Sequence, residues 1–229
     1  MSQIKIRDVS KADMPQLRAI VRDTWDWADL FETKEALEAA IAMYVNHAMH
    51  NSSFGKVALL NGELAGVIFG TAFGEAPACR GLLEDGMPHA LTLLNATEFE
   101  RKAIYEYLSK TYAVYSELIG SNAERYGGTL DFIVVPEAAR GFSVGKQLWH
   151  ALEAYFHKKA VRLIYVYSDT DCNYGFYDHM GFHKKAELKV DYIFDDDEDN
   201  FTMGQFLYEY NLRRSLPCQR SQSYLRQQL

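Results

Sequence analysis

The sequence predicts an α/β protein, and two stretches carry most of that prediction. Residues 4–69 read as strand, helix, helix, strand, strand, with period-2 alternation in the first strand and helical spacing of apolar residues after it. Residues 130–156 read as a strand, a glycine-containing loop and a helix. The chain has 229 residues, 48% of them hydrophobic and 24% charged, which is typical of a globular domain with a real core.

The N-terminal stretch carries a local signal for each of its elements. Residues 4–7 alternate as a strand does, and Ser10 followed by Asp13 is an N-cap signal for the next helix. Thr33 is placed to cap a second helix. Asn61-Gly62 separates apolar runs at 57–60 and 63–69, and this dipeptide favours the type I′ turn of a β-hairpin.

Residues 71–128 read as an inserted helical arm. The part at 74–88 is irregular, whereas 89–119 has strong helical character and ends at Gly120. Two roles fit the arm. It could cover one face of the sheet, or it could form a wall or lid of a substrate site, since long insertions in compact domains tend to be functional. Its helix carries four tyrosines that can present rings and hydroxyls to a substrate: Tyr105, Tyr107, Tyr112 and Tyr115.

The C-terminal part predicts two more strands, at 186–194 and 201–210, on either side of the acidic run 195–200. That run lacks the spaced pattern of a calcium loop, so we expect a solvated hairpin tip. Residues 213–229 contain four arginines and no acid, and we expect a surface tail or a strap that binds a second copy. The expected organisation is one domain at 1–212 followed by a tail at 213–229.

The loop at 139–146 is the strongest functional signal. It lies between the strand at 130–135 and a helix that starts near Gln147, and it contains Gly141, Ser143 and Gly145. A small-residue loop at a helix start exposes unpaired N–H groups at the positive end of the helix dipole, which favours a phosphate. Arg140 and Lys146 add two positive charges.

The spacing of the loop excludes two common phosphate motifs. Gly141 and Gly145 are too close for a Walker loop, and no Gly-x-Gly-x-x-Gly is present. The run resembles instead the Arg/Gln-x-x-Gly-x-Gly/Ala pyrophosphate loop of the GCN5-related N-acetyltransferase (GNAT) superfamily. Arg140 and Gly145 match the ends of that pattern, and Ser143 stands where the family usually has its middle glycine.

A second motif strengthens the resemblance. The strand at 163–168 is followed by Asn173, by Phe176-Tyr177 and then by Gly181-Phe182. The family has an asparagine, a Phe-Tyr pair on a short helix and a Gly-Phe pair that opens the last strand. In the family the asparagine contacts the pantetheine arm of coenzyme A, and the tyrosine lies near the thioester sulfur.

The resemblance implies the GNAT fold, a mixed, mostly antiparallel central sheet with helices on both faces, here with an inserted arm. It implies acetyl transfer from acetyl-CoA to a primary amine by direct attack in a ternary complex, with Tyr177 as the acid that meets the departing thiolate and with no metal. The residues expected to bind the cofactor are Ile133, Val134, Val135, Arg140, Gly141, Phe142, Ser143, Val144, Gly145, Lys146, Asn173, Phe176 and Tyr177.

The general base is less well defined by the sequence. A free alkyl amine is mostly protonated near neutrality, so a base or a water chain must remove a proton before it attacks. Asp131 is a candidate, because strict alternation places it on the same face as Ile133 and Val135. Glu75, Glu98 and Glu100 are alternatives.

Composition limits the partners. The net charge is -7, and such an acidic balance argues against nucleic acid. No apolar run approaches the ~20 residues of a membrane span, and the N-terminus has no signal-peptide core. Three cysteines without paired spacing argue against a disulfide framework or a zinc ribbon. We therefore expect a cytoplasmic protein that acts on a small amine or a protein amino group, with a homodimer left open.

Two classes of function remain. The first is an N-acetyltransferase, and the second is a module of the same fold that binds acyl-CoA as a sensor or in an interaction, without turnover. Retention of Asn173 and Tyr177 favours the enzyme, because a module without catalysis would not need the phenol.

Overall fold

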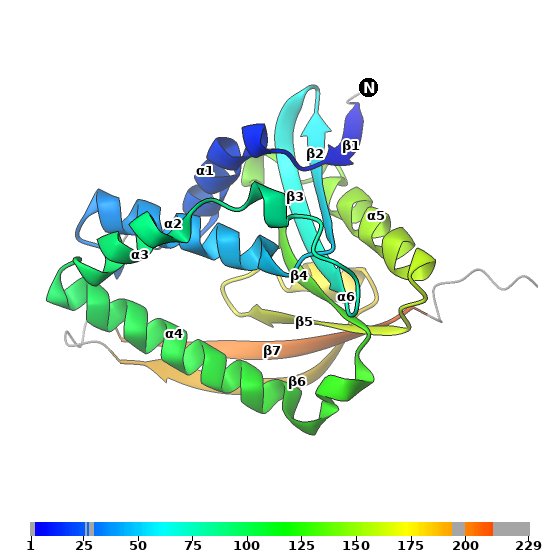
Figure 1. Cartoon of the computed structure of the whole chain (residues 1–229). Coiled ribbons are helices and arrows are strands. Elements are labelled where there is room, and N and C mark those ends of the chain that lie inside the picture. Colours follow the sequence, from blue (N-terminus) through cyan, green and yellow to red (C-terminus); the bar gives the residue numbers. More distant parts are fainter. Residues whose placement is uncertain (1–2, 26, 28–29, 194–199, 213–229) are drawn as a thin grey trace, which may run out of the picture.

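One sheet organises the chain (Figure 1). The computed structural model describes residues 3–25, 27, 30–193 and 200–212, and within them seven strands pair in the order β1-β2-β3-β4-β5-β7-β6. Neighbouring strands are antiparallel except β4 and β5. The strands are β1 (Ile4–Asp8), β2 (Phe54–Leu60), β3 (Glu63–Ala72), β4 (Gly128–Val134), β5 (Leu163–Asp169), β6 (His183–Tyr192) and β7 (Phe201–Asn211).

Helices cover both faces of this sheet. They are α1 (Met14–Thr24), α2 (Lys34–His50), α3 (Gly86–Leu94), α4 (Glu98–Ile119), α5 (Val144–Lys158) and α6 (Gly175–His179). Figure 1 shows α1 and α2 on one side of strands β1–β4 and α5 on the other side. This arrangement confirms the mixed, mostly antiparallel α/β fold that the resemblance implies.

Three apolar clusters hold these layers together. The first joins α5 to the sheet around the fully buried Trp149 and Phe156. The second joins α1 and α2 to the opposite face, with Leu17 and Ile41 fully buried. The third packs Ala103 of α4 against Tyr192 and Met203 of the β6–β7 hairpin. Burial of these side chains provides the main stabilisation of the fold, at roughly 1.5–3 kcal/mol for each large apolar side chain.

Several local predictions are confirmed. Thr33 caps α2, and its hydroxyl accepts a hydrogen bond from the N–H of Ala36 at 3.3 Å. Asn61 and Gly62 have φ angles of 54° and 98°, which is the left-handed backbone that a type I′ turn requires. Local chemistry determines both features, so the sequence was sufficient to find them.

The inserted arm differs from the expected single helix. It folds as two helices, α3 and α4, and Thr97 starts the second one. The hydroxyl of Thr97 accepts from the N–H of Glu100, and the carboxylate of Glu100 accepts from the N–H of Thr97, which is a capping box. The second oxygen of Glu100 accepts from the N–H and the hydroxyl of Thr33, both at 2.8 Å. Glu100 therefore ties the start of α4 to the start of α2.

Replacing Glu100 with alanine should lower the free energy of unfolding by about 3 kcal/mol, because a fully buried carboxylate with charge-assisted hydrogen bonds at two helix starts is lost. Urea denaturation measures the change. Glu98→Ala is the control: its exposed side chain pairs only with Lys102 one turn away, so an effect within about 0.5 kcal/mol is expected. Equal losses in the two variants would contradict the role of Glu100.

The acidic tip at 195–199 and the tail at 213–229 lie outside the described residues, so the expectations for them stay predictions. The boundary between domain and tail likewise stays a prediction. Among the described residues, no helix is long and apolar enough to cross a membrane, and no group of three or more His, Cys, Asp or Glu side chains is arranged to hold a metal ion.

Candidate active site

The site forms where the sheet splits. β4 and β5 run parallel, but they pair only at Gly128 with Ile164 and at Thr129 with Tyr165. Beyond these residues the two strands diverge, and the backbone of β4 at 133–135 borders an open cleft instead of a neighbouring strand. A strand edge without a partner can pair with an extended ligand.

A cleft of about 430 Å³ lies at this split. Of the thirteen residues expected to bind the cofactor, twelve line it, and Phe142 does not, because its side chain is exposed to solvent. Two motifs about thirty residues apart in sequence therefore meet in one place. The residues of the cleft that the sequence singled out are Ile133, Val134, Val135, Arg140, Gly141, Ser143, Val144, Gly145, Lys146, Asn173, Phe176 and Tyr177.

The loop before α5 has the backbone shape of an anion site. Gly141 and Ser143 have positive φ angles of 83° and 63°, and α5 begins at Val144. The first N–H groups of a helix have no partners within it, and they point out of its start with the positive end of the dipole behind them. Arg140 and Lys146 are exposed beside this helix start.

Close packing requires a glycine at position 145. A Cβ atom placed on Gly145 would lie 3.2 Å from the ring of Phe176. The start of α5 therefore approaches α6 closely, and a larger residue at position 145 would push the two motifs apart.

Tyr177 lines the cleft and is largely buried, with a relative exposure of 8%. Its ring packs on Phe182 and Tyr208, with centroids 5.5 and 5.4 Å apart. Burial raises the pKa of the phenol well above its usual range, and the charges of Cys172 and Asp169 raise it further. The hydroxyl therefore stays protonated at neutral pH and can act as a hydrogen-bond donor.

Cys172 also lines the cleft and is half-buried. Burial raises the pKa of its thiol to about 12, and the charge of Asp169 adds to the effect. A thiol with such a pKa is almost entirely protonated near pH 7, so it is a poor nucleophile. Direct transfer without a cysteine intermediate agrees with this chemistry.

Asp131 lies on the opposite face from the one that strict alternation predicts. Phe69 and Gly70 of β3 pair with Phe132 and Leu130, so Asp131 is an extra residue in β4, a β-bulge. The bulge interrupts the alternation and turns Asp131 toward α2. There one carboxylate oxygen accepts hydrogen bonds from the hydroxyls of Thr71 at 2.5 Å and Ser52 at 2.9 Å.

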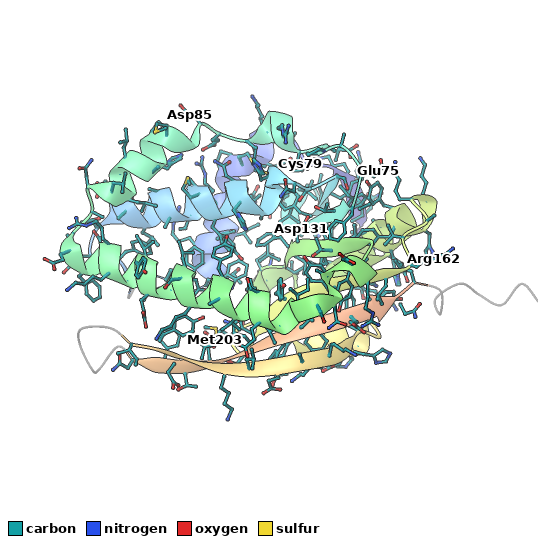
Figure 2. The ribbon with its side chains drawn as sticks, turned by 60° about the horizontal axis from the view of Figure 1, so that its bottom comes forward. Glu75, Cys79, Asp85, Asp131, Arg162 and Met203 are labelled. Carbon is teal, nitrogen blue, oxygen red and sulfur yellow. The ribbon has the colours of Figure 1, made fainter. Side chains whose placement is uncertain are left out.

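The carboxylate of Asp131 is unusual in its chemistry. Burial raises its pKa to about 6, although the bonds from Thr71 and Ser52 act in the opposite direction. Along β4 it stands between the paired Thr129 and the cleft residue Ile133, which is the apex of the split. Figure 2 labels it near the centre of the molecule, between the helices and the sheet. A carboxylate with this pKa can exchange a proton near neutral pH.

The other candidate bases have structural partners elsewhere. Glu100 forms the helix caps described above, and although burial opposes the shift, hydrogen bonds from Thr97 and Thr33 lower its pKa. Glu98 is exposed and pairs with Lys102, and Glu75 pairs with Lys159 at 2.5 Å on the surface. None of these three carboxylates lines the cleft; Asp131 does not line it either, but it lies in the same strand two residues before the cleft residue Ile133.

The structure adds residues that the sequence motifs did not indicate. Trp25, just after α1, lines the cleft opposite the cofactor loop. Asp169 ends β5, and one of its oxygens accepts the N–H groups of Asp171 and Cys172 at 3.0 and 2.9 Å. One sequence signal could have indicated Trp25 as a site residue. It forms a pair of tryptophans with Trp27 in a segment that has no helical spacing of apolar residues. Nothing in the local sequence distinguished Asp169.

The structure thus combines a mostly antiparallel sheet that opens between its two parallel strands with a helix start at the opening. Residues 89–192 match the family model described as an acetyltransferase (GNAT) domain. A search of curated proteins found no match. The family match assigns residues 89–192 to the GNAT superfamily, which confirms the resemblance that the two motifs carry, and solved acetyltransferase structures share the fold of the chain.

Solved structures share this fold at low sequence identity. The ribosomal-protein-S18-alanine N-acetyltransferase of Escherichia coli is 11% identical with a TM-score of 0.53, over 96% of this chain and 99% of its own. An N-acetyltransferase of Staphylococcus aureus Mu50 is 17% identical with a TM-score of 0.51, over 92% and 99%. Ard1 of Thermoplasma volcanium is 14% identical with a TM-score of 0.50, over 91% and 97%. The family match supports acyl transfer in general, and these likenesses support the fold.

Proposed function

We propose that the protein transfers an acetyl group from acetyl-CoA to a primary amine. One observation carries the proposal: the start of α5 and the buried Tyr177 line the same cleft at the split between β4 and β5. A phosphate group and a reactive thioester are the two ends of acetyl-CoA, and the cleft offers a matching partner for each.

The chain's own residues would hold the cofactor as follows. The N–H groups of the loop at 141–146 bind the pyrophosphate, and Arg140 and Lys146 offset its charge. The open edge of β4 at 133–135 pairs with the amide groups of the pantetheine, as an added strand does. Asn173 contacts the same arm from the opposite side of the cleft.

The reaction needs two proton transfers. The neutral amine nitrogen attacks the thioester carbonyl carbon, an N–C bond forms and the C–S bond breaks. Asp131 accepts a proton that the nitrogen loses, directly or through water. Tyr177 donates a hydrogen bond to the thiolate that leaves, and the thiolate takes its proton from solvent. An N–H group of β4 beside the split stabilises the oxyanion. The products are an N-acetyl amine and free coenzyme A.

The proposal is tested by incubation of the protein with acetyl-CoA and a panel of amines while free thiol is measured. Amine-dependent thiol release supports the enzyme. The alternative, a module that binds acyl-CoA without turnover, predicts acetyl-CoA binding by calorimetry but no thiol release with any amine. The raised pKa and the position of Tyr177 favour the enzyme.

A negative charge in the loop should weaken acetyl-CoA binding. Ser143 is exposed and has a φ of 63°, a conformation that Asp and Asn tolerate better than most residues. Ser143→Asp places a carboxylate where the pyrophosphate is expected, and like-charge repulsion should raise the Kd for acetyl-CoA at least tenfold, about 1.4 kcal/mol. Isothermal titration calorimetry measures the change.

Ser143→Asn is the matched control, because it has the same size and backbone preference without the charge. It should bind acetyl-CoA within about twofold of wild type, well below the tenfold step of 1.4 kcal/mol. If Ser143→Asp binds as tightly as Ser143→Asn, the loop does not hold the pyrophosphate.

A further inference from the structure

The structure points to the kind of amine that the protein accepts. We propose that the acceptor is a small primary amine with an uncharged, ring-sized apolar body, and that this body binds in a cavity between α2 and α4. This inference rests on the proposed acetyl transfer and names the acceptor of that reaction.

The cavity has a volume of about 250 Å³ and is distinct from the cofactor cleft. A cavity of about 150 Å³ lined by apolar side chains holds benzene, so there is room for a ring with a short linker. Ala40 and Met43 of α2 form one wall, and Ile104 and Leu108 of α4 form the other. Leu108 is 45% exposed and Tyr112 is 49% exposed, so the cavity reaches the surface beside these residues.

Aromatic rings connect the cavity with the cofactor cleft. Trp25 lines the cleft, while Trp27 and Tyr44 line the cavity. The ring of Tyr44 lies 5.8 Å from that of Trp25 and 5.0 Å from that of Trp27, between centroids. One aromatic cluster therefore borders both the cavity and the cleft, and in this proposal the amine nitrogen extends past Tyr44 toward the thioester.

A buried phenol lies at this junction. Burial raises the pKa of the Tyr44 phenol, and the neighbouring groups Tyr107, Cys172, Asp169 and Tyr177 raise it further, so the hydroxyl stays protonated near neutral pH and can donate a hydrogen bond.

The chemistry of the cavity wall decides between two kinds of amine. Among the residues that the structure describes, no Asp, Glu, Lys or Arg side chain lines it. Burial, with the charge of His50, lowers the pKa of His47 at the rim, so its imidazole is neutral near pH 7. A second ammonium group on the body of the ligand would lose its hydration without gaining a partner, which costs several kcal/mol. A polyamine is therefore disfavoured, and an apolar body gains free energy from burial.

The inserted arm covers part of the sheet, and in this proposal it also forms a wall of the acceptor site. Tyr107 and Tyr115 of α4 stack on Tyr192 and Tyr167 of the sheet, with centroids 5.4 and 4.0 Å apart. Other residues of the same helix line the cavity. Tyr105, in contrast, is 74% exposed and faces solvent, so it cannot contact a ligand in the cavity.

Three amines test the proposal: 2-phenylethylamine, ethylamine and spermidine. We expect the wild-type protein to acetylate 2-phenylethylamine with a kcat/KM at least tenfold above those of the other two. Ala40→Phe fills the cavity from α2, and it should lower kcat/KM for 2-phenylethylamine at least tenfold. Its values for ethylamine and its Kd for acetyl-CoA should match wild type. Ala113→Phe, on an exposed position of α4 outside the cavity, is the control and should change nothing.

Binding without turnover provides a second readout. Trp27 lines the cavity, so 2-phenylethylamine should change the tryptophan fluorescence of wild type and not that of Ala40→Phe. If Ala40→Phe melts at a lower temperature than wild type, the smaller Ala40→Leu replaces it in both measurements. A preference for spermidine, or equal effects of Ala40→Phe on all amines, overturns the inference. Binding of 2-phenylethylamine in the cavity with no acetylation of any amine supports the site and overturns the proposed enzyme instead.

Discussion

Tyr177→Phe should lower kcat about 100-fold and leave the Kd for acetyl-CoA close to wild type. The phenylalanine keeps the ring contacts with Phe182 and Tyr208, so the fold of the cleft is preserved. The lost hydroxyl acts on the thiolate as the C–S bond breaks, so its absence appears in the transition state and not in binding. A hydrogen bond to a charged group contributes about 1.5–3 kcal/mol, which corresponds to this loss in rate.

The high pKa of Tyr177 limits what the hydroxyl can do. A thiol has a pKa near ~8.5, so complete transfer of the phenolic proton to a thiolate would be uphill. We therefore expect Tyr177 to stabilise the thiolate by hydrogen bonding, with the final proton supplied by solvent. Tyr174→Phe is the matched control: Tyr174 is 39% exposed, only three residues away, and does not line the cleft. Equal kcat values for Tyr177→Phe and Tyr174→Phe would remove Tyr177 from the mechanism.

The features that the sequence predicted well depend on local chemistry. The Asn61-Gly62 turn, the Thr33 cap and the loop before α5 each need particular residues within a few positions of one another. Only the family resemblance predicted that the two cofactor motifs lie in one site. The periodicity of apolar residues does not predict the strand order, in which β7 lies between β5 and β6; that order comes from the structure.

The features that the sequence missed depend on contacts between distant segments. The bulge at Asp131 arises from the register between β3 and β4, about 60 residues apart, and it reversed the face on which this carboxylate lies. The cavity lies between α2 and α4, whose lining residues are again about 60 positions apart in the sequence. In both cases a rule based on period 2 or period 3.6 describes each element correctly and gives no information on how two elements meet.

The remaining prediction concerns the base. Asp131→Asn should lower kcat by at least about 100-fold, within the range of a lost general base. In wild type, kcat/KM should rise with pH through about 6 as the carboxylate of Asp131 loses its proton, and this limb should be absent from Asp131→Asn. The pH profile of thiol release measures both effects. Glu75→Gln, which removes an exposed carboxylate paired with Lys159, is the control and should retain the wild-type profile.

The folding stability of Asp131→Asn should not fall with its activity, and this difference separates a catalytic role of Asp131 from a structural one. The pKa of Asp131 is about 6 in the folded protein against 3.8 for an ordinary aspartate, so the folded state binds the proton more tightly. Folding stability from this group is therefore greatest below about pH 4 and decreases as pH rises to about 6, by roughly 3 kcal/mol in all.

Asparagine avoids this penalty, and its carbonyl oxygen can still accept hydrogen bonds from the hydroxyls of Thr71 and Ser52. Asp131→Asn should thus be at least as stable as wild type at pH 8 by urea denaturation, while it is far less active. A variant that is unstable and fully active when folded would show that Asp131 holds β3, β4 and α2 together and that another group takes the proton.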